Sequence, residues 1–467
     1  MRLDHVLGGV DGLDRLGDPA AVDVRDVTHD SRLAVAGSLY CCISGAVVDG
    51  HDYAAAAVDA GAVALLCERL VDVDVAQVRV AATRPAMAVA AANFWDAPSR
   101  KLLVAGVTGT NGKTTTTYLL QSVLAAHGWP TGVIGTLSGA RTTPESTELQ
   151  RQLARLVAEG HEAVAMEVSS HALAQHRVEA TWFAVAGFTN LSQDHLDFHG
   201  DMESYFGAKA ALFSPGVTAL GAVNADDAFG RRLLAEAAVP LVPYSMADAE
   251  GLAVTSAGST FRWRGVPVRL RLGGRFNVTN ALCAAAMAEC LGVGPKAVAE
   301  GLGAVASVPG RFEVIDAGQP FTVVVDYAHT PDSLDQLLQA AREAVAPGGR
   351  LVVVFGAGGD RDRAKRPLMG AVAAARADEV IVTTDNPRDE DPAAIIDDVM
   401  AGVTGPAQVV PDRAGAIAAA VGQGRAGDVV VIAGKGHETG QTMAGRTVPF
   451  DDRVVARRVL EGMGARP

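Results

Sequence analysis

The sequence predicts an α/β protein of three domains. The chain has 467 residues, which is about three times the length of a common domain. Apolar runs typical of buried strands alternate with helical patterns rich in Ala, Val and Gly, as expected of parallel sheets. We expect a small N-terminal α/β domain at 1–98, a central P-loop-type mononucleotide-binding domain at 99–310 and a C-terminal Rossmann-like domain at 311–467.

Composition narrows the class of protein. The formal net charge is −13, which argues against nucleic acid and against anionic membranes as partners. The five cysteines lack metal-ligand spacing, and their scatter suits reduced thiols. We find no secretion signal and no apolar run long enough to span a bilayer. We therefore expect a cytoplasmic protein, and we expect it to be a monomer.

The N-terminal domain carries one polar cluster. A loop with His29, Asp30, Ser31 and Arg32 precedes a turn at Gly37 and a strand through Leu39–Ile43. One interpretation is a solvated turn. The other is hydrogen bonding to a polar ligand, with Arg32 facing a phosphate.

The stretch 101–124 predicts a phosphate-binding loop. An apolar strand stops at a Gly/Thr/Asn turn, and a helix begins at Lys113. The glycines allow backbone N–H groups to point at phosphate oxygens. The lysine would reach the β- and γ-phosphates, and the next hydroxyl would bind Mg²⁺. The alternative is a glycine-rich turn with a surface lysine, because Val107 replaces the first glycine of the general pattern. The residues expected at the phosphates are Gly109, Thr110, Asn111, Gly112, Lys113, Thr114 and Thr115.

Two further segments of the central domain carry candidate ligands. A buried strand, Ala163–Val168, places Glu167 at its C-terminal end, where a carboxylate can hold the Mg²⁺ of a nucleotide. The loop 190–199 crowds together Asp194, His195, Asp197 and His199. These four side chains predict either a metal or substrate contact, or a helix start capped by acids.

Later residues of the central domain have more ordinary interpretations. Lys209 lies on an apolar helix face, where snorkelling is the usual explanation. Alternating apolar residues in 245–272 predict antiparallel hairpins. Asn277 and Asn280 open the helix that follows a glycine pair. We expect one of them to cap that helix and the other to contact a base edge.

The C-terminal domain predicts a site for a zwitterion. Strands at 321–326 and 351–355, and further strands in the stretches 379–392 and 428–441, alternate with helices. The glycine loop 356–367 is basic, and Arg361 replaces the last glycine of a dinucleotide fingerprint. Loops after three of these strands carry both charges, as a ligand with an amine and a carboxylate would require. The alternative interpretation is that each of these loops is only a solvent-exposed rim of the sheet and binds no ligand.

Ten stretches, taken in order, resemble the Mur ligase family, and most of all its diaminopimelate-adding E type. The family's short loop, G-T-x-G-K-[ST], removes the objection raised by Val107. The segment 40–44, YCCIS, departs from the family pattern. The matching stretches are GVTGTNGKTTT, MEVSSHALAQHRV, NLSQDHLDFHG, YFGAKAALF, GRFNVTNALCAAA, PGRFEV, VDYAHTPDSL, FGAGGDRDRAKRPLM, DNPRDEDP and GKGHE.

This resemblance implies an ADP-forming ligase of peptidoglycan precursor synthesis, with ATP and Mg²⁺ as cofactors and UDP-N-acetylmuramoyl-dipeptide and diaminopimelate as partners. It implies that Lys113, Glu167, His195 and Lys209 are catalytic, Lys209 as a carbamate, and that Thr114, Glu167, His195 and Lys209 hold magnesium. It adds Asn280, Arg311 and Asp326 to the ATP site. The implied UDP-substrate contacts are Ser31, Arg32, Thr142, Thr143, Ser169, Gln175 and Arg177. The implied amino-acid contacts are Arg361, Asp385, Asn386, Pro387, Arg388, Gly434 and Glu438.

The run DNPR at 385–388 favours diaminopimelate, because Arg388 can pair with its distal carboxylate. The alternatives are L-lysine or another acceptor with the same chemistry, a natural-product paralogue, or a nucleotide-binding switch without catalysis.

Overall fold

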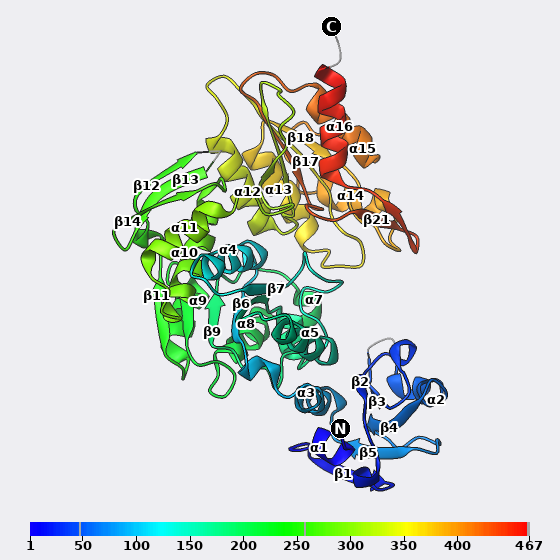
Figure 1. Cartoon of the computed structure of the whole chain (residues 1–467). Coiled ribbons are helices and arrows are strands. Elements are labelled where there is room, and N and C mark those ends of the chain that lie inside the picture. Colours follow the sequence, from blue (N-terminus) through cyan, green and yellow to red (C-terminus); the bar gives the residue numbers. More distant parts are fainter. Residues whose placement is uncertain (46–47, 256–257, 465–467) are drawn as a thin grey trace.

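The computed structural model describes residues 1–45, 48–255 and 258–464, and it contains three α/β units in chain order (Figure 1). The N-terminal unit has a five-stranded sheet in the order β1-β5-β4-β3-β2, parallel except for the β1–β5 pair. Its strands are β1 Gly12–Leu16, β2 Asp26–Thr28, β3 Ser38–Cys41, β4 Ala62–Cys67 and β5 Ala76–Val80. Its helices are α1 Leu3–Val6, α2 Ala54–Asp59 and α3 Thr83–Phe94.

The central unit is a six-stranded parallel sheet in the order β11-β10-β9-β6-β8-β7. Its strands are β6 Leu103–Thr108, β7 Thr131–Ile134, β8 Ala163–Glu167, β9 Val185–Phe188, β10 Gly221–Asn224 and β11 Leu241–Tyr244. Its helices are α4 Lys113–Ala126, α5 Ser146–Ala158, α6 Ser170–Ala174, α7 Leu196–His199, α8 Met202–Ala210, α9 Ala228–Glu236, α10 Arg275–Cys290 and α11 Pro295–Ala304.

Both faces of the central sheet are covered. Helices α4, α10 and α11 pack on one face and α5 and α8 on the other, each around its own apolar cluster. The hairpins predicted in 245–272 are present as an antiparallel sheet of β12 Glu250–Thr255, β13 Gly258–Trp263 and β14 Val266–Leu270. The alternating residues Phe261, Trp263, Val268 and Leu270 are its buried face.

The C-terminal unit has a six-stranded sheet in the order β15-β16-β20-β17-β18-β19, parallel except for the β15–β16 pair. Its strands are β15 Glu313–Val314, β16 Thr322–Asp326, β17 Leu351–Phe355, β18 Glu379–Val382, β19 Gln408–Val409 and β20 Val429–Ala433. A hairpin of β21 Gly440–Met443 and β22 Arg446–Pro449 follows. Its helices are α12 Pro331–Glu343, α13 Lys365–Arg376, α14 Pro392–Met400, α15 Arg413–Gly422 and α16 Asp452–Gly464.

Strand β17 shows why this sheet needs apolar residues at every position. Leu351, Val353 and Phe355 pack in the cluster under α12, α13 and α14, whereas Val352 and Val354 pack in the cluster under α15 and α16. Side chains alternate across a strand, so a sheet covered on both faces is apolar throughout. The predicted α/β class with parallel sheets is confirmed. None of the helices in the described ranges has the length and apolar character needed to cross a bilayer.

Candidate active site

The phosphate loop joins β6 to α4 as predicted. Gly109 has φ 147° and Gly112 has φ 84°. A Cβ at Gly109 would lie 1.9 Å from Thr189 Oγ1, and one at Gly112 would lie 2.2 Å from Asn280 Oδ1. Both positions therefore need glycine for space and for conformation. Val107 is a fully buried residue of β6, which lies before the loop begins.

Lys113 is part of the loop and not a surface lysine. Its Nζ donates to the carbonyl oxygens of Gly109 at 2.9 Å and Thr110 at 2.8 Å. Burial lowers the pKa of the ammonium. The loop thus holds a positive charge over its own backbone, where a phosphate chain would lie.

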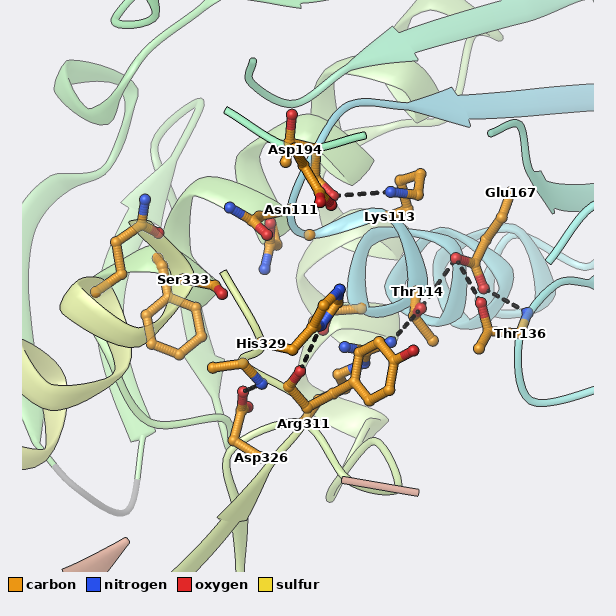
Figure 2. Close-up of a pocket in the computed structure, with 18 of the residues that line it drawn as sticks. Asn111, Lys113, Thr114, Thr136, Glu167, Asp194, Arg311, Asp326, His329 and Ser333 are labelled. Carbon is orange, nitrogen blue, oxygen red and sulfur yellow. Dashed lines mark hydrogen bonds between the residues drawn. The ribbon is translucent and has the colours of Figure 1, made fainter. Parts of the chain in front are cut away.

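Glu167 and Thr114 form a pair of oxygen ligands beside the loop (Figure 2). Glu167 is 1% exposed, and it accepts from Thr114 Oγ1 at 2.9 Å and from Thr136 N at 2.8 Å. Arg311 Nη2 donates to Thr114 Oγ1 at 3.1 Å. A buried carboxylate next to a hydroxyl is the kind of oxygen donor set that suits Mg²⁺. These residues therefore fit the metal that the sequence predicted.

Lys209 does not snorkel, so that prediction is wrong. The residue is 1% exposed, and Nζ donates to Gly109 O at 2.8 Å. Burial, together with the charge of Lys113, holds the pKa of Lys209 well below its usual range. Helix α8 packs its lysine under the phosphate loop, and only the tertiary fold shows this.

The histidine and acid loop is only partly assembled as a metal site. His195 Nε2 lies 3.3 Å from Asp194 Oδ2, and His199 Nε2 lies 3.0 Å from Ser170 Oγ. Within the described ranges no group of three or more His, Cys, Asp or Glu side chains is placed to hold a metal. The prediction of acid capping is wrong for these four residues. Helix α7 starts at Leu196, the preceding His195 makes no side-chain cap, and Asp201 caps α8.

Neither Asn277 nor Asn280 caps α10, so this prediction is also wrong. The helix follows Gly274 without a side-chain cap. Asn277 Nδ2 donates back to Gly273 O at 2.8 Å, and Asn280 Nδ2 donates to Asn277 Oδ1 at 3.1 Å. Both are buried, and this chain of bonds holds Asn280 against Gly112.

The nucleotide cavity lies between the central and C-terminal units and holds about 240 Å³. Asn111 Nδ2 donates to Asp332 Oδ2 at 2.9 Å, which ties the phosphate loop to α12. The Arg311 guanidinium lies 4.4 Å from the Tyr327 ring centre. Asp326 accepts from two backbone N–H groups, and burial raises its pKa. The predicted ATP residues lining this cavity are Thr110, Asn111, Gly112, Lys113, Thr114, Thr115, Asn280, Arg311 and Asp326.

A second cavity holds about 200 Å³, and we call it the amino-acid pocket because most of the residues predicted to contact the amino acid line it. Loops after β17, β18 and β20 build most of it, as predicted from the parallel strand ends. Pro387 is buried and does not line it. The predicted residues that line it are Arg361, Asp385, Asn386, Arg388, Gly434 and Glu438.

Charges of both signs face the amino-acid pocket. Glu438 Oε2 accepts from Asn386 Nδ2 at 2.7 Å and from Lys435 Nζ at 2.9 Å. Asp385 is buried, its Oδ2 has no hydrogen-bond partner among the described residues, and burial raises its pKa. A buried carboxylate oxygen in this state is suited to accept from a ligand ammonium.

The two cavities share one wall. Asp194, His195, Tyr327 and His329 line both of them. His329 Nδ1 donates to the backbone oxygen of Tyr327 at 2.9 Å, and burial lowers its pKa to about 4. Sequence reasoning gave no role to Tyr327 or His329. Their place directly after a strand end, in DYAHTP, was the available signal.

The predicted UDP-substrate residues fall into two separate groups. Thr143 Oγ1 donates to Glu167 O and accepts from Ser169 N, and Arg177 Nη2 donates to Gln175 Oε1 at 2.7 Å. The first group has five residues, and its remaining residue, Thr142, shares a hydrogen bond with the Thr136 hydroxyl. Thr136 also donates a hydrogen bond to Glu167 Oε2. These five residues therefore lie beside Glu167, one of the candidate metal ligands.

Ser31 and Arg32 belong to the N-terminal unit, and within the described residues neither makes a side-chain hydrogen bond to any of the other five. The Arg32 side chain is 86% exposed and pairs with its neighbour Asp30. The Arg32 side chain fits the solvated-turn interpretation, whereas His29 of the same loop is half-buried, with its Nδ1 2.8 Å from Thr147 Oγ1 of the central unit.

Three domain families match the chain in order. They are the Mur ligase family catalytic domain at residues 23–107, the Mur ligase middle domain at 107–288 and the Mur ligase glutamate ligase domain at 310–436. A UDP-N-acetylmuramoyl-L-alanyl-D-glutamate–2,6-diaminopimelate ligase from Geobacillus kaustophilus is 45% identical over 95% of this chain and 96% of its own. The chain belongs to the Mur ligase family.

Other Mur ligases agree with this assignment. A protein of the same printed name from Streptomyces avermitilis is 44% identical over 94% of this chain and 93% of its own. A solved structure of that name has a TM-score of 0.69 at 32% identity and covers 99% of both chains. The Mur ligase F type from Thermotoga maritima in complex with ADP has a TM-score of 0.66 at 19% identity over 94% of this chain and 99% of its own, which shows the shared fold.

Proposed function

We propose that this Mur ligase joins diaminopimelate to UDP-N-acetylmuramoyl-L-alanyl-D-glutamate with conversion of ATP to ADP and phosphate. The observation that carries the proposal is the wall shared by the nucleotide cavity and the amino-acid pocket. An amine bound in one pocket can reach a phosphorylated carboxyl group formed at the other without leaving the protein. Relatives that carry this printed name match nearly the whole chain.

The charges of the amino-acid pocket support diaminopimelate as the acceptor. Diaminopimelate carries two carboxylates and two amines. Arg361 and Arg388 are cations for the carboxylates, and Asp385 and Glu438 are acceptors for an ammonium. L-lysine would leave one guanidinium without a partner, which costs binding energy in a partly closed pocket.

We assign one substrate to each domain. Residues 1–98 would bind the UDP moiety through Ser31 and Arg32, residues 99–310 would bind ATP, and residues 311–467 would bind the amino acid. The Mur ligase domain matches at 23–107, 107–288 and 310–436 follow the same order. A reaction between ATP and a nucleotide sugar belongs in the cytoplasm.

The residues around the phosphates have separate roles in this proposal. Lys113 would neutralise the γ-phosphate, and the loop N–H groups would hold the chain of phosphates. Thr114 and Glu167 would hold one Mg²⁺, and His195 with a carbamylated Lys209 would hold a second. Bound magnesium supplies positive charge that stabilises the transferring phosphoryl group. Lys209 suits carbamylation because burial favours the uncharged amine that reacts with CO₂.

The chemistry has two steps. An oxygen of the D-glutamyl γ-carboxylate attacks the γ-phosphorus of ATP, and ADP leaves, giving an acyl phosphate. The amine of diaminopimelate then attacks the acyl carbon, and phosphate leaves with the bonding electron pair. A carboxylate is a poor electrophile, so phosphorylation supplies the leaving group. Catalysis by the chain is positioning and charge neutralisation.

Product analysis tests this proposal. The protein is incubated with ATP, magnesium, UDP-N-acetylmuramoyl-L-alanyl-D-glutamate and an equimolar mixture of amino acids that includes diaminopimelate and L-lysine. The masses of the nucleotide products are then measured by mass spectrometry. We expect one new product that contains diaminopimelate, with one ADP for each product formed. A product that contains lysine instead would overturn the acceptor assignment, and ADP release without any amide would overturn the ligase assignment.

A further inference from the structure

Lys365 is a buried lysine whose ammonium has no close partner. It is the first residue of α13, its side chain is 8% exposed, and it lines the amino-acid pocket. The nearest carboxylate is Asp194 Oδ1 of the central unit, at 3.9 Å from Nζ. Across the described residues, Lys365 Nζ donates no hydrogen bond, whereas Lys113, Lys209 and Lys435 each donate to backbone oxygens.

An ammonium in this state is suited to bind an anion. It has three N–H donors, none of which is used within the described residues, so they are free to bind the oxygens of an anion in the pocket. Helix α13 adds to this preference, because its N-terminal end has no side-chain cap and carries partial positive charge. The pocket therefore contains a third cation besides Arg361 and Arg388.

The position of Lys365 indicates which anion it meets. Two guanidinium groups already match the two carboxylates of diaminopimelate, so the lysine is left over. Its neighbours Asp194 and His329 line the nucleotide cavity as well as the amino-acid pocket, and its charge acts on His329. Lys365 itself lines the amino-acid pocket and not the nucleotide cavity, but it lies beside Asp194 of the shared wall, where the amine and the phosphorylated carboxyl group must meet.

We infer that Lys365 is a catalytic residue that binds the phosphate of the acyl-phosphate intermediate during amide formation. This inference rests on the proposed function. The amine lone pair forms the C–N bond while the carbonyl π electrons move to oxygen. The oxyanion then re-forms the carbonyl while the C–O bond to phosphate breaks, phosphate takes that bonding electron pair, and the proton lost from nitrogen leaves with it as hydrogen phosphate. Lys365 neutralises the phosphate charge in this second step.

Lys113 and Lys365 therefore divide the two steps. Lys113 belongs to the loop of the central unit and acts on ATP in the first step. Lys365 comes from α13 in the same C-terminal unit as the amino-acid loops, so it acts with the bound amine in place. Loss of Lys365 is expected to slow the second step and leave the first step intact.

Rapid-quench kinetics of Lys365→Met, Lys365→Arg and Arg363→Met test this. Arg363 is the matched control, because it lies two residues away with its side chain 70% exposed and pairs with Glu390. With all substrates saturating, ADP, amide and borohydride-trapped acyl phosphate are followed in one turnover. For Lys365→Met we expect ADP formation within threefold of wild type and amide formation about 100-fold slower, the usual loss when one charge-stabilising group is removed. Acyl phosphate should accumulate, Lys365→Arg should recover part of the rate, and Arg363→Met should match wild type.

Three results would overturn the inference alone. They are an unchanged amide rate, equal losses of ADP and amide formation, or a raised KM for diaminopimelate with unchanged kcat, which would assign Lys365 to an amino-acid carboxylate. Wild-type protein that forms no amide would overturn the proposed function as well. If Lys365→Met does not fold, as judged by its thermal melting, Lys365→Gln is put through the same measurements and the same results decide.

Discussion

Replacement of Arg388 by alanine should disable the use of diaminopimelate and spare ATP. Arg388 Nη1 donates to Gly359 O at 2.5 Å, and its remaining N–H groups make no bond within the described chain, so they are available to a carboxylate. Loss of one partner from a partly buried charge pair costs about 2–3 kcal/mol, the lower end of the range for buried pairs. At 1.4 kcal/mol for each tenfold change, kcat/KM for diaminopimelate should fall by roughly 30- to 150-fold.

The backbone of this loop should survive the change. Arg388 has φ 54°, and its backbone N–H and C=O bond Thr442 and Ala444 whatever its side chain is. ADP release is measured against diaminopimelate and then against ATP, with the other substrates saturating. The KM for ATP should stay within twofold of the wild-type value. For Arg388→Lys, kcat/KM for diaminopimelate should lie between the values of wild type and Arg388→Ala, because lysine keeps the charge and loses the forked geometry. A loss below threefold, or an equal effect on ATP, would refute the reasoning.

Three other changes follow from buried pairs in the structure. Glu167→Gln removes an anionic ligand, so the magnesium concentration for half-maximal activity should rise at least tenfold; an unchanged magnesium titration would contradict that role. Asp452→Asn leaves the fully buried Arg413 with Asp385, 4.0 Å away, as its nearest remaining carboxylate, so urea unfolding should show a loss of about 3 kcal/mol, the lower end of the range for a broken buried pair, and a loss below 1 kcal/mol would contradict it. Hydrogen bonding to Arg366 holds the pKa of Glu390 at about 2, below its usual 4.5. Wild type should therefore be more stable than Glu390→Gln, with the full difference in free energy of unfolding above pH 4.5 and a loss of that difference as the pH falls towards 2. A difference that does not change with pH would contradict this role of the Glu390–Arg366 pair.

The phosphate loop and the strand ends of the C-terminal unit were predictable because their signals are local. Gly109 and Gly112 sit between a strand and a helix, and parallel strands bring their carboxyl ends to one edge whatever the loops contain. Asp385 and Glu438 therefore meet as predicted. The pocket charges follow directly from the loop sequences.

The failures were contacts between residues far apart in the chain. Lys209 looks like any lysine on an apolar helix face until α8 packs under Gly109, 100 residues earlier. The bond from Asn277 to Gly273 depends on where the glycine turn places a carbonyl, which residue preferences at helix starts do not reveal. Lys365 was visible as one basic residue among several, but its burial beside Asp194 belongs to the contact between two domains.

The proposed reaction requires an acyl phosphate to form where the two cavities meet. An isotope measurement tests this directly. UDP-N-acetylmuramoyl-L-alanyl-D-glutamate labelled with ¹⁸O in the γ-carboxyl group is converted in the presence of ATP and diaminopimelate, and the released phosphate is analysed by mass spectrometry. One labelled oxygen in each phosphate is the predicted result. Unlabelled phosphate, released at the same rate as the amide product, would contradict the account.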